Sequence, residues 1–316
     1  MNSESALSNA TIIFNPLAGR GKTPSIANKA KSFLTQQGWA TVNVIQSEYA
    51  GHIENVLADE WGKQSQLIVL IGGDGTLREL VSGLRTANLH TEIAFIPTGN
   101  ANVVARELGI PLKPQHAIEL LGTRDTKEVD LCVLKQDQQP DQIFLAMLEV
   151  GFGAKTVSIC TRLRNGPLKT AYKLWGDFVY GIAAVMALKG LSEKTFNITL
   201  DNNAQSSIST HCVVANMRNY AKGWSLTPDA VCDDGRIATA ISKQTGTVAI
   251  FRTFFAASLT KKLDPTYMDY KKANHVEISN ADGLFVQIDG DPITLSGKAQ
   301  ITVEKGAFAI RVKATT

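Results

Sequence analysis

The sequence lacks clustered cysteines and any apolar run long enough to cross a bilayer. Its four cysteines lie far apart and form no Cys-x-x-Cys pair, so we expect reduced structural thiols rather than disulfides or metal ligands. The apolar run at residues 178–188 falls well short of the ~20 residues that a transmembrane helix needs. Residues 1–10 have neither a basic start nor an apolar centre, which argues against a signal peptide. We therefore expect a cytoplasmic protein that associates with a membrane only transiently.

The sequence also lacks a strong excess of charge of either sign. Its 32 Lys and Arg residues nearly balance 29 Asp and Glu residues, which leaves a net charge of +3. Without a concentrated basic stripe, no nucleic-acid partner is expected, but the weak positive charge suits brief contact with an anionic membrane surface. A chain of 316 residues, 44% of them hydrophobic, suits two globular domains rather than a disordered segment.

Several common motifs fail at single positions. A P-loop ending in Gly21-Lys22 would need a glycine where Pro16 stands, and a dinucleotide fingerprint beginning at Gly19 would need one at Pro24. The five histidines show no metal-ligand spacing, and the chain has no Gly-x-Ser-x-Gly elbow. A phosphate site in this chain must therefore be of another kind.

The N-terminal part of the chain alternates strand-like and helix-like patterns. Strand-like runs occupy residues 11–14, 40–45, 67–71 and 92–96, and helical spacing of apolar residues follows each of them. Such alternation with short connections predicts an α/β domain with a parallel sheet, helices on both faces and right-handed crossovers. Ligands of such sheets bind at the carboxyl ends of the strands.

Three of these strands run into loops that carry glycine, at residues 15–22, 72–76 and 97–102. In the middle loop the glycines permit close backbone approach, and the start of the following helix favours an anion such as a polyphosphate. A plain tight turn is the alternative for any one of these loops. Three loops lining one crevice favour a nucleotide-phosphate site.

Beyond Lys127 the pattern changes to short strand-like runs separated by turn residues, which predicts a mainly antiparallel β domain. Helical patterns interrupt it at residues 166–189 and 246–259. One strand is expected at 208–216, and Lys305-Gly306 has the composition of a hairpin turn between two further strands. We therefore expect a nucleotide-binding α/β domain at residues 1–127, which the C-terminal tail could join, and a β-rich domain at residues 128–316.

Seven sequence blocks follow one another along the chain in a characteristic order and spacing. They are Asn15-Pro16-x-Ala18-Gly19, Gly72-Gly73-Asp74-Gly75-Thr76, Pro97-x-Gly99-Asn100-Ala101-Asn102, Gly151-Phe152-Gly153, Asn216, residues 228–235 and Ile288-Asp289-Gly290-Asp291. Together they resemble the diacylglycerol kinase catalytic-domain family. The pattern is most similar to the soluble bacterial lipid kinases, with sphingosine kinases as relatives. The middle loop alone is shared with NAD kinases and, loosely, with phosphofructokinases.

This resemblance implies an ATP-binding domain of the phosphofructokinase and NAD-kinase type, a β-rich lipid-binding domain, and catalysis in the cleft between them. It assigns ATP binding to Asn15, Gly19, Gly72, Gly73, Asp74, Gly75, Thr76, Gly99 and Asn102. It also implies that Asp74 helps to hold the catalytic Mg²⁺. Backbone N–H groups, Mg²⁺ and one carboxylate base form a sufficient set for phosphoryl transfer.

The same resemblance makes Asp289 the base that accepts the proton of the lipid hydroxyl, with Asp291 assisting it or binding metal. The family usually has Glu where Asp291 stands, so the reach here is one methylene shorter. Without the resemblance, Asp289-Gly290 is better interpreted as a hairpin turn.

The third loop departs from the family pattern, and a loop of the second domain has two possible interpretations. In the third loop, Asn100 stands in place of Thr and Val103 in place of an acidic residue, so adenine or ribose recognition could differ. The loop with Val231, Asp234 and Arg236 resembles a structural Mg²⁺ site of the bacterial branch, since a carboxylate and carbonyls suit Mg²⁺. A solvated turn is the alternative there.

A group of basic residues lies near the apolar run at 178–188, namely Arg162, Arg164, Lys169 and Lys173. They could meet lipid headgroups, at about 1 kcal/mol each near an anionic surface. They could equally form a solvated helix face.

The sequence therefore predicts an ATP- and Mg²⁺-dependent kinase of a lipid hydroxyl, on a diacylglycerol-like lipid or a long-chain base. A kinase of NAD or another soluble metabolite and a non-catalytic nucleotide or lipid sensor are the alternatives. The sequence does not identify the lipid, and it leaves a homodimer open.

Overall fold

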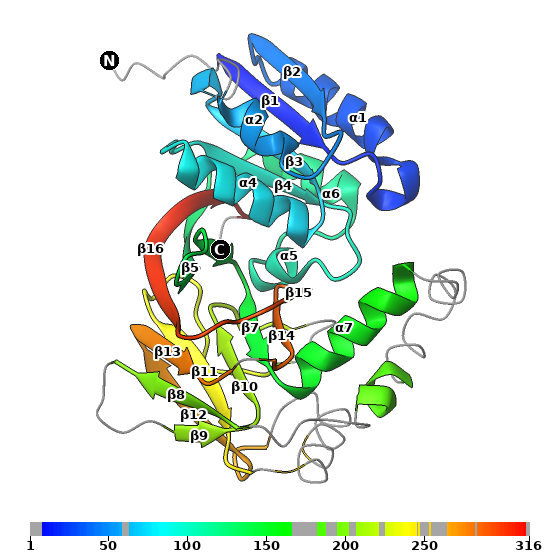
Figure 1. Ribbon diagram of the computed structural model, residues 1–316. Coiled ribbons are helices and arrows are strands. Elements are labelled where there is room, and N and C mark those ends of the chain that lie inside the picture. The colour runs from blue at the N-terminus through cyan, green and yellow to red at the C-terminus, as the bar shows by residue number, and fades with distance from the viewer. Residues whose placement is uncertain are drawn as a thin grey trace. The chain divides into compact units, whose positions relative to one another are not determined.

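The computed structural model describes residues 8–58, 63–165, 182–187, 195–201, 207–220, 225–244, 246, 253, 264–281 and 283–313 (Figure 1). The chain forms two compact units. The first is Met1–Asp130 with Lys305–Thr316, and the second is Leu131–Glu304.

The first unit is built on a parallel sheet. Its strands are β1 (Asn9–Phe14), β2 (Thr41–Gln46), β3 (Leu67–Gly72) and β4 (Glu92–Pro97). They lie in the order β2-β1-β3-β4, and every neighbouring pair is parallel. All six residues of β3 are buried, because a central parallel strand is covered on both faces. The predicted α/β domain with a parallel sheet is confirmed.

Helices cover both faces of this sheet (Figure 1). They are α1 (Thr23–Gln36), α2 (His52–Ala58), α4 (Asp74–Thr86), α5 (Val103–Glu107) and α6 (Pro114–Glu119), with short 3₁₀ turns at Gly19–Gly21 and Leu120–Gly122. Helices α1 and α6 pack on each other and on the sheet, while α2 packs against α4. In α1 the buried residues Ala27, Ala30 and Leu34 recur at helical spacing and form one apolar stripe.

The strand order contains a switch point between β1 and β3. After β1 the chain crosses to β2 on one side, and it then returns to β3 and β4 on the other. Loops that leave adjacent strands in opposite directions open a crevice at the carboxyl edge of the sheet. The loops after β1, β3 and β4 therefore lie at one edge.

The second unit consists mainly of antiparallel strands: β6 (Gln142–Phe144), β7 (Met147–Val150), β8 (Phe196–Leu200), β9 (Ser207–Ser209), β10 (Cys212–Ala215), β11 (Ile237–Ser242), β12 (Met268–Ala273), β13 (His275–Ser279), β14 (Val286–Ile288) and β15 (Asp291–Ile293). One sheet has the order β12-β11-β10-β7-β14-β15 and is antiparallel throughout. Strands β13, β8 and β9 pair antiparallel in the other sheet. The predicted antiparallel β domain is confirmed.

Two long strands run through both units. Strand β5 (Thr126–Gln136) pairs with β6, and β16 (Ala299–Arg311) pairs antiparallel with β13 at its start. At its end, β16 pairs parallel with β4 through Ile310 and Ile93. A core of buried apolar side chains lies between the two sheets of the second unit and includes Phe144, Val214 and Ile278.

Two details of the predicted strands are wrong. The predicted turn at Lys305-Gly306 lies inside continuous β16, where Gly306 has φ 58° and donates its N–H to Asp130 Oδ1 at 2.8 Å. The single strand expected at 208–216 is two strands, β9 and β10, in different sheets.

Helix α7 (Phe152–Asn165) was not predicted from the sequence pattern. The helical patterns at 166–189 and 246–259 fall mostly outside the described residues. Among the helices that the structure describes, none combines the length and the apolar character needed to cross a membrane.

Candidate active site

Three glycine-bearing loops meet at the carboxyl edge of the parallel sheet. Asn15 donates its N–H to the carbonyl of Ile71 at 3.1 Å, which ties the first loop to the end of β3. Gly19 donates to the carbonyl of Thr98 at 3.1 Å, and Thr98 donates to that of Gly72 at 2.7 Å. The three loops predicted to be neighbours are therefore joined by backbone hydrogen bonds.

Glycine is required where the second and third loops touch. A Cβ on Gly99 would lie 2.8 Å from Gly73 Cα, and one on Gly73 would lie 3.3 Å from Gly99 Cα. Gly19, in the first loop, has φ 59°, a conformation that side chains other than glycine rarely adopt. The loops approach each other more closely than residues with a Cβ would allow.

The first turn of α4 faces open space at Gly75. A Cβ built there would meet no atom within 4 Å, and the residue is exposed. The first N–H groups of a helix have no partner within the helix and carry its positive dipole end. This turn can therefore accept an anion.

Asp74 connects the second and third loops. Its Oδ1 accepts the N–H of Val104 at 3.1 Å, at the start of α5. Burial raises the pKa of the Asp74 carboxyl, and backbone N–H groups of Val103, Val104 and Asn102 oppose that shift. The structure thus gives Asp74 a role in holding α5, and its predicted contact with Mg²⁺ stays a prediction.

Two buried oxygen atoms in the third loop have no hydrogen-bond partner among the described residues. They are Thr98 Oγ1 and Asn102 Oδ1. Asn102 adopts a left-handed conformation with φ 47° and donates Nδ2 to the carbonyl of Gly99 at 3.0 Å. Unsatisfied buried polar atoms are costly unless a ligand or water pairs them. The sequence pointed to Asn102 but missed Thr98, although it lies inside the same motif.

The side chain of Asn15 shapes its own loop. Its Oδ1 accepts the N–H of Leu17 at 2.9 Å, and its carbonyl accepts the hydroxyl of Thr23 at 2.9 Å. The first of these bonds forms a turn typical of asparagine, and the second ties the loop to the start of α1. Its predicted contact with ATP stays a prediction.

In the second unit, Asp289 and Gly290 form the two-residue turn between β14 and β15. Their φ angles are 48° and 91°, as tight hairpins require. The Asp289 carboxylate accepts three backbone N–H groups, from Leu145 at 2.8 Å to Oδ2, and from Ala146 at 2.9 Å and Met147 at 3.0 Å to Oδ1. The hairpin interpretation is therefore correct, and it leaves open the catalytic role. Asp291 is exposed at the start of β15.

The loop predicted to hold a structural Mg²⁺ contains an ion pair. Asp234 Oδ2 lies 2.6 Å from Lys272 Nζ, and Oδ1 accepts the N–H of Arg236 at 2.9 Å. Val231 and Arg236 line a groove of about 690 Å³ with Arg218, Pro228, Asp229, Tyr270, Lys271 and Lys272. Among the described residues, no three or more His, Cys, Asp or Glu side chains group as metal ligands. Mg²⁺ here would compete with the Lys272 ammonium, and this site stays a prediction.

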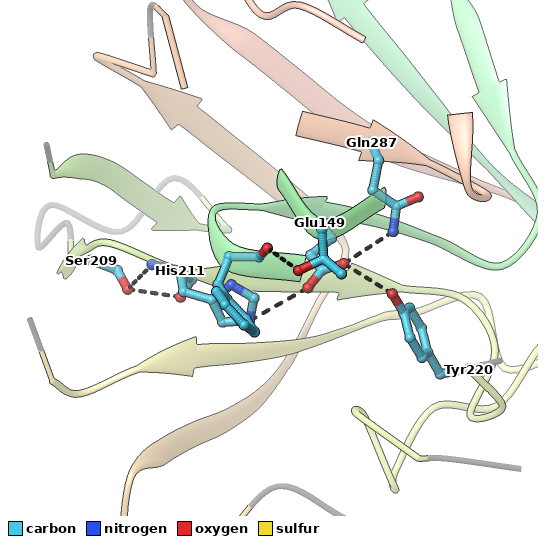
Figure 2. Close-up of polar contacts among 7 residues, drawn as sticks. Glu149, Ser209, His211, Tyr220 and Gln287 are labelled. Carbon is cyan, nitrogen blue, oxygen red and sulfur yellow. Dashed lines mark hydrogen bonds and ion pairs between the residues drawn. The ribbon is translucent and has the colours of Figure 1, made fainter. Parts of the chain in front are cut away.

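A buried polar cluster surrounds Glu149 on β7 (Figure 2). Glu149 Oε2 accepts Nε2 of Gln287 at 3.1 Å and the hydroxyl of Tyr220 at 3.5 Å. Its Oε1 lies 3.8 Å from Nε2 of His211. A Cβ on Gly153 would collide with Oε1, so this glycine leaves the space that the carboxylate fills.

Burial shifts both ionisable groups of this pair toward their neutral forms. It raises the pKa of Glu149 to about 7 and lowers the pKa of His211 to about 4. Sequence reasoning missed the cluster. Glu149 is a single charge in an apolar run, and its partners are far away in the sequence. Tyr220 is 71 residues away and Gln287 is 138 residues away.

The basic group near residues 178–188 lies largely outside the described residues. Arg162 is exposed on α7, while Lys169, Lys173 and the side chain of Arg164 are not described. Contact with lipid headgroups stays a prediction.

Fold and motifs define a protein that joins a parallel α/β domain to an antiparallel β-sandwich. Residues 9–134 match the family model of the diacylglycerol kinase catalytic domain, and residues 164–312 match that of the YegS C-terminal NAD kinase β-sandwich-like domain. Residues 9–134 therefore belong to the diacylglycerol kinase catalytic-domain family, and the match of residues 164–312 is to the C-terminal domain of the bacterial YegS-like branch.

Relatives match over most of the chain. A diacylglycerol kinase from Mycobacterium tuberculosis is 26% identical over 89% of this chain and 88% of its own length. A protein from Pseudomonas putida named "Probable lipid kinase YegS-like" is 27% identical over 82% of this chain and 81% of its own length. The crystal structure of a diacylglycerol kinase from Bacillus anthracis superposes with a TM-score of 0.71, at 22% identity, over 96% of this chain and 97% of the other. That last likeness concerns the fold.

Proposed function

We propose that this protein is an ATP-dependent lipid kinase that transfers the γ-phosphoryl group to the hydroxyl of a diacylglycerol-like lipid or a long-chain base. The observation that carries the proposal is the meeting of three glycine-bearing loops around the buried oxygens of Thr98 and Asn102. Members of the same family named diacylglycerol kinase and lipid kinase support the choice of acceptor.

The N-terminal loops fit a nucleotide. Backbone N–H groups of Gly75 and Thr76 at the start of α4 would bind the phosphates, because this turn is open and carries the positive helix end. Thr98 Oγ1 and Asn102 Oδ1 would pair with donor or acceptor groups of the nucleotide. Asp74, next to these N–H groups, would help to hold Mg²⁺, which when bound neutralises charge on the phosphates.

Asp289 would serve as the general base. As the lipid oxygen bonds to the γ-phosphorus and the bond to the leaving ADP oxygen breaks, the carboxylate accepts the hydroxyl proton. The three backbone N–H groups that bind Asp289 fix the carboxylate in one orientation. Asp291, two residues further on, would assist it or bind metal.

A second candidate is a kinase of NAD or another soluble metabolite. The specific observation is that the C-terminal residues match a model described as NAD kinase β-sandwich-like. Such a domain can host different acceptors, because fold alone does not determine the substrate.

The test is transfer of labelled phosphate from ATP, with Mg²⁺, to a total lipid extract or to a soluble metabolite mixture. We expect label in the lipid phase, and mass spectrometry of that phase identifies the acceptor. Label confined to the aqueous phase would favour the metabolite kinase, and ATP binding without transfer would favour a sensor. A Gly99→Val variant controls for contaminating kinases, since its Cβ alone would lie 2.8 Å from Gly73 Cα.

A further inference from the structure

The turn that presents Asp289 is bound on its inner side by one glutamine. In a two-residue hairpin, the N–H of the second loop residue has no partner on the opposite strand. Here that residue is Gly290, and its N–H donates to Oε1 of Gln287 at 2.6 Å. Gln287 is 1% exposed, so its amide lies in the protein interior.

The other end of the same amide is held by the buried glutamate. Nε2 of Gln287 donates to Glu149 Oε2 at 3.1 Å, and the two residues lie directly opposite each other in the pairing of β14 with β7 (Figure 2). A glutamine amide can bind with either end, and the surrounding hydrogen bonds decide which. Because Oε2 of Glu149 accepts from the amide nitrogen, the amide oxygen is left for the N–H of Gly290.

Strand β7 also supplies a second attachment of the same turn. Met147, two residues before Glu149, accepts the N–H of Asp289 at 3.0 Å and donates its own N–H to the Asp289 carboxylate. The backbone of β7 thus holds Asp289, while the Glu149 side chain acts through Gln287 on Gly290. The two attachments reach adjacent residues of one turn.

We infer that Gln287 is a positioning residue that fixes the Asp289–Gly290 turn for phosphoryl transfer, and that Glu149 orients its amide. This inference rests on the proposed role of Asp289 as base. Loss of Gln287 would let the turn and its carboxylate shift, and a misplacement of about 1 Å can cost roughly 10²-fold in rate.

The test compares Gln287→Met with a matched control, Gln136→Met. Gln136 is also buried, and its Oε1 likewise accepts a loop N–H, from Ser296 at 3.1 Å. We expect Gln287→Met to lower kcat about 10- to 100-fold with KM for ATP and lipid within about twofold. Gln136→Met should lose stability but keep kcat within about twofold. Equal loss of kcat in both variants would overturn the inference.

A pair of variants at Glu149 tests the orienting role. Glu149→Gln keeps an oxygen that can accept from Gln287, whereas Glu149→Leu removes it. We expect Glu149→Leu to reproduce the loss of kcat and Glu149→Gln to restore most of it. If both lose kcat equally, Glu149 does not orient Gln287. Gln287→Asn, which keeps both polar atoms but shortens their reach, replaces Gln287→Met if that variant does not fold.

Hydrogen exchange of residues 288–291 gives a readout that does not need turnover. In Gln287→Met this segment should exchange faster than in the wild type, while Gln136→Met leaves it unchanged. Unchanged exchange in Gln287→Met would overturn the inference even if the wild type is active. If the wild type phosphorylates no lipid, the proposed function fails, and exchange alone decides whether Gln287 holds the turn.

Discussion

Asp289 binds three backbone N–H groups with the same carboxylate that we propose as the base. Each hydrogen bond to a charged group contributes about 1.5–3 kcal/mol, and removing the acceptor leaves its donors unsatisfied. A substitution at this residue therefore changes both stability and chemistry. To separate the two effects, the substitution must be compared with the same substitution at an aspartate that binds backbone N–H groups elsewhere in the protein.

Asp201 offers that control for Asp289→Asn. It also has positive φ, 50°, and its Oδ1 accepts the N–H groups of Asn274 at 2.7 Å and His275 at 3.0 Å. We expect Asp289→Asn and Asp201→Asn each to lower the free energy of unfolding by about 1–3 kcal/mol in urea titrations. Only Asp289→Asn should lower kcat, by roughly 10²- to 10⁴-fold. Wild-type kcat in Asp289→Asn would exclude its role as base.

Glu149 predicts a pH dependence of stability. Burial raises its pKa from the ordinary 4.5 to about 7, so the folded protein binds this proton more tightly than the unfolded chain. The stabilisation is full below pH 4.5 and is lost as the pH rises through 7. Relative to Glu149→Gln, the wild type should gain about 3 kcal/mol between pH 8 and pH 4.

His211 is buried in both proteins, so the part of its opposite shift that comes from burial cancels in this difference. Burial lowers its pKa from 6.5 to about 4, so its contribution is present above pH 6.5 and is lost as the pH falls through 4. Chemical denaturation of both proteins at each pH measures the difference. A difference that does not change with pH would contradict a buried Glu149 that binds a proton on folding.

At the scale of elements, helix α4 joins the proposed phosphate loop to the packing of the first unit. Its buried residues include Leu77, Leu80 and Leu84, which line the face toward the protein interior. Its two interior glycines, Gly75 and Gly83, lie in different surroundings. One faces open space, and the other faces helix α2.

Substituting these two glycines should separate stability from ATP binding. Gly75→Ala meets no atom and should raise stability by up to about 1 kcal/mol, because alanine favours helix. Its methyl group would occupy space proposed for phosphate, so we expect KM for ATP to rise about tenfold. In Gly83→Ala the new Cβ would lie 2.6 Å from Leu57 Cδ1, which should cost about 1–3 kcal/mol while KM stays near wild type. The reverse pattern would exclude the first turn of α4 as phosphate site.

At the scale of the whole molecule, β16 carries the chain from the second unit back to the first. Arg311, at its end, is 5% exposed. Its guanidinium donates to Glu92 Oε2 from Nη2 at 3.0 Å and from Nε at 3.2 Å, and to the carbonyl of Leu121 from Nη1 at 2.7 Å. These bonds fasten the last strand to β4 and to the end of the following helical segment.

Arg311→Met should therefore destabilise the protein by about 1–3 kcal/mol, because the carbonyl of Leu121 loses its donor and Glu92 its partner. Lys313→Ala, two residues further on and exposed, should change stability by less than about 0.5 kcal/mol. Urea denaturation followed by circular dichroism measures both. Similar midpoints for the two variants would show that Arg311 does not fasten β16.

Patterns short enough to be local were predictable from the sequence by itself. The helical spacing around Ala27 and Leu34 predicts a helix that buries one stripe. The fully apolar run that ends at Ile71 predicts a strand that is buried on both faces. Glycine-rich motifs marked the loops after β1, β3 and β4. The motif order also indicated the family, which the comparisons confirmed.

Only the tertiary structure decided which distant groups meet. The separations of the acceptor Asp289 from its donors Leu145 to Met147 are 142 to 144 residues, and Glu149 lies 138 residues from Gln287. Gly306, where the sequence predicted a turn, continues β16 and donates its N–H to Asp130, 176 residues away. Local propensity carries no information about such partners, because register and strand order are set by packing of the whole core.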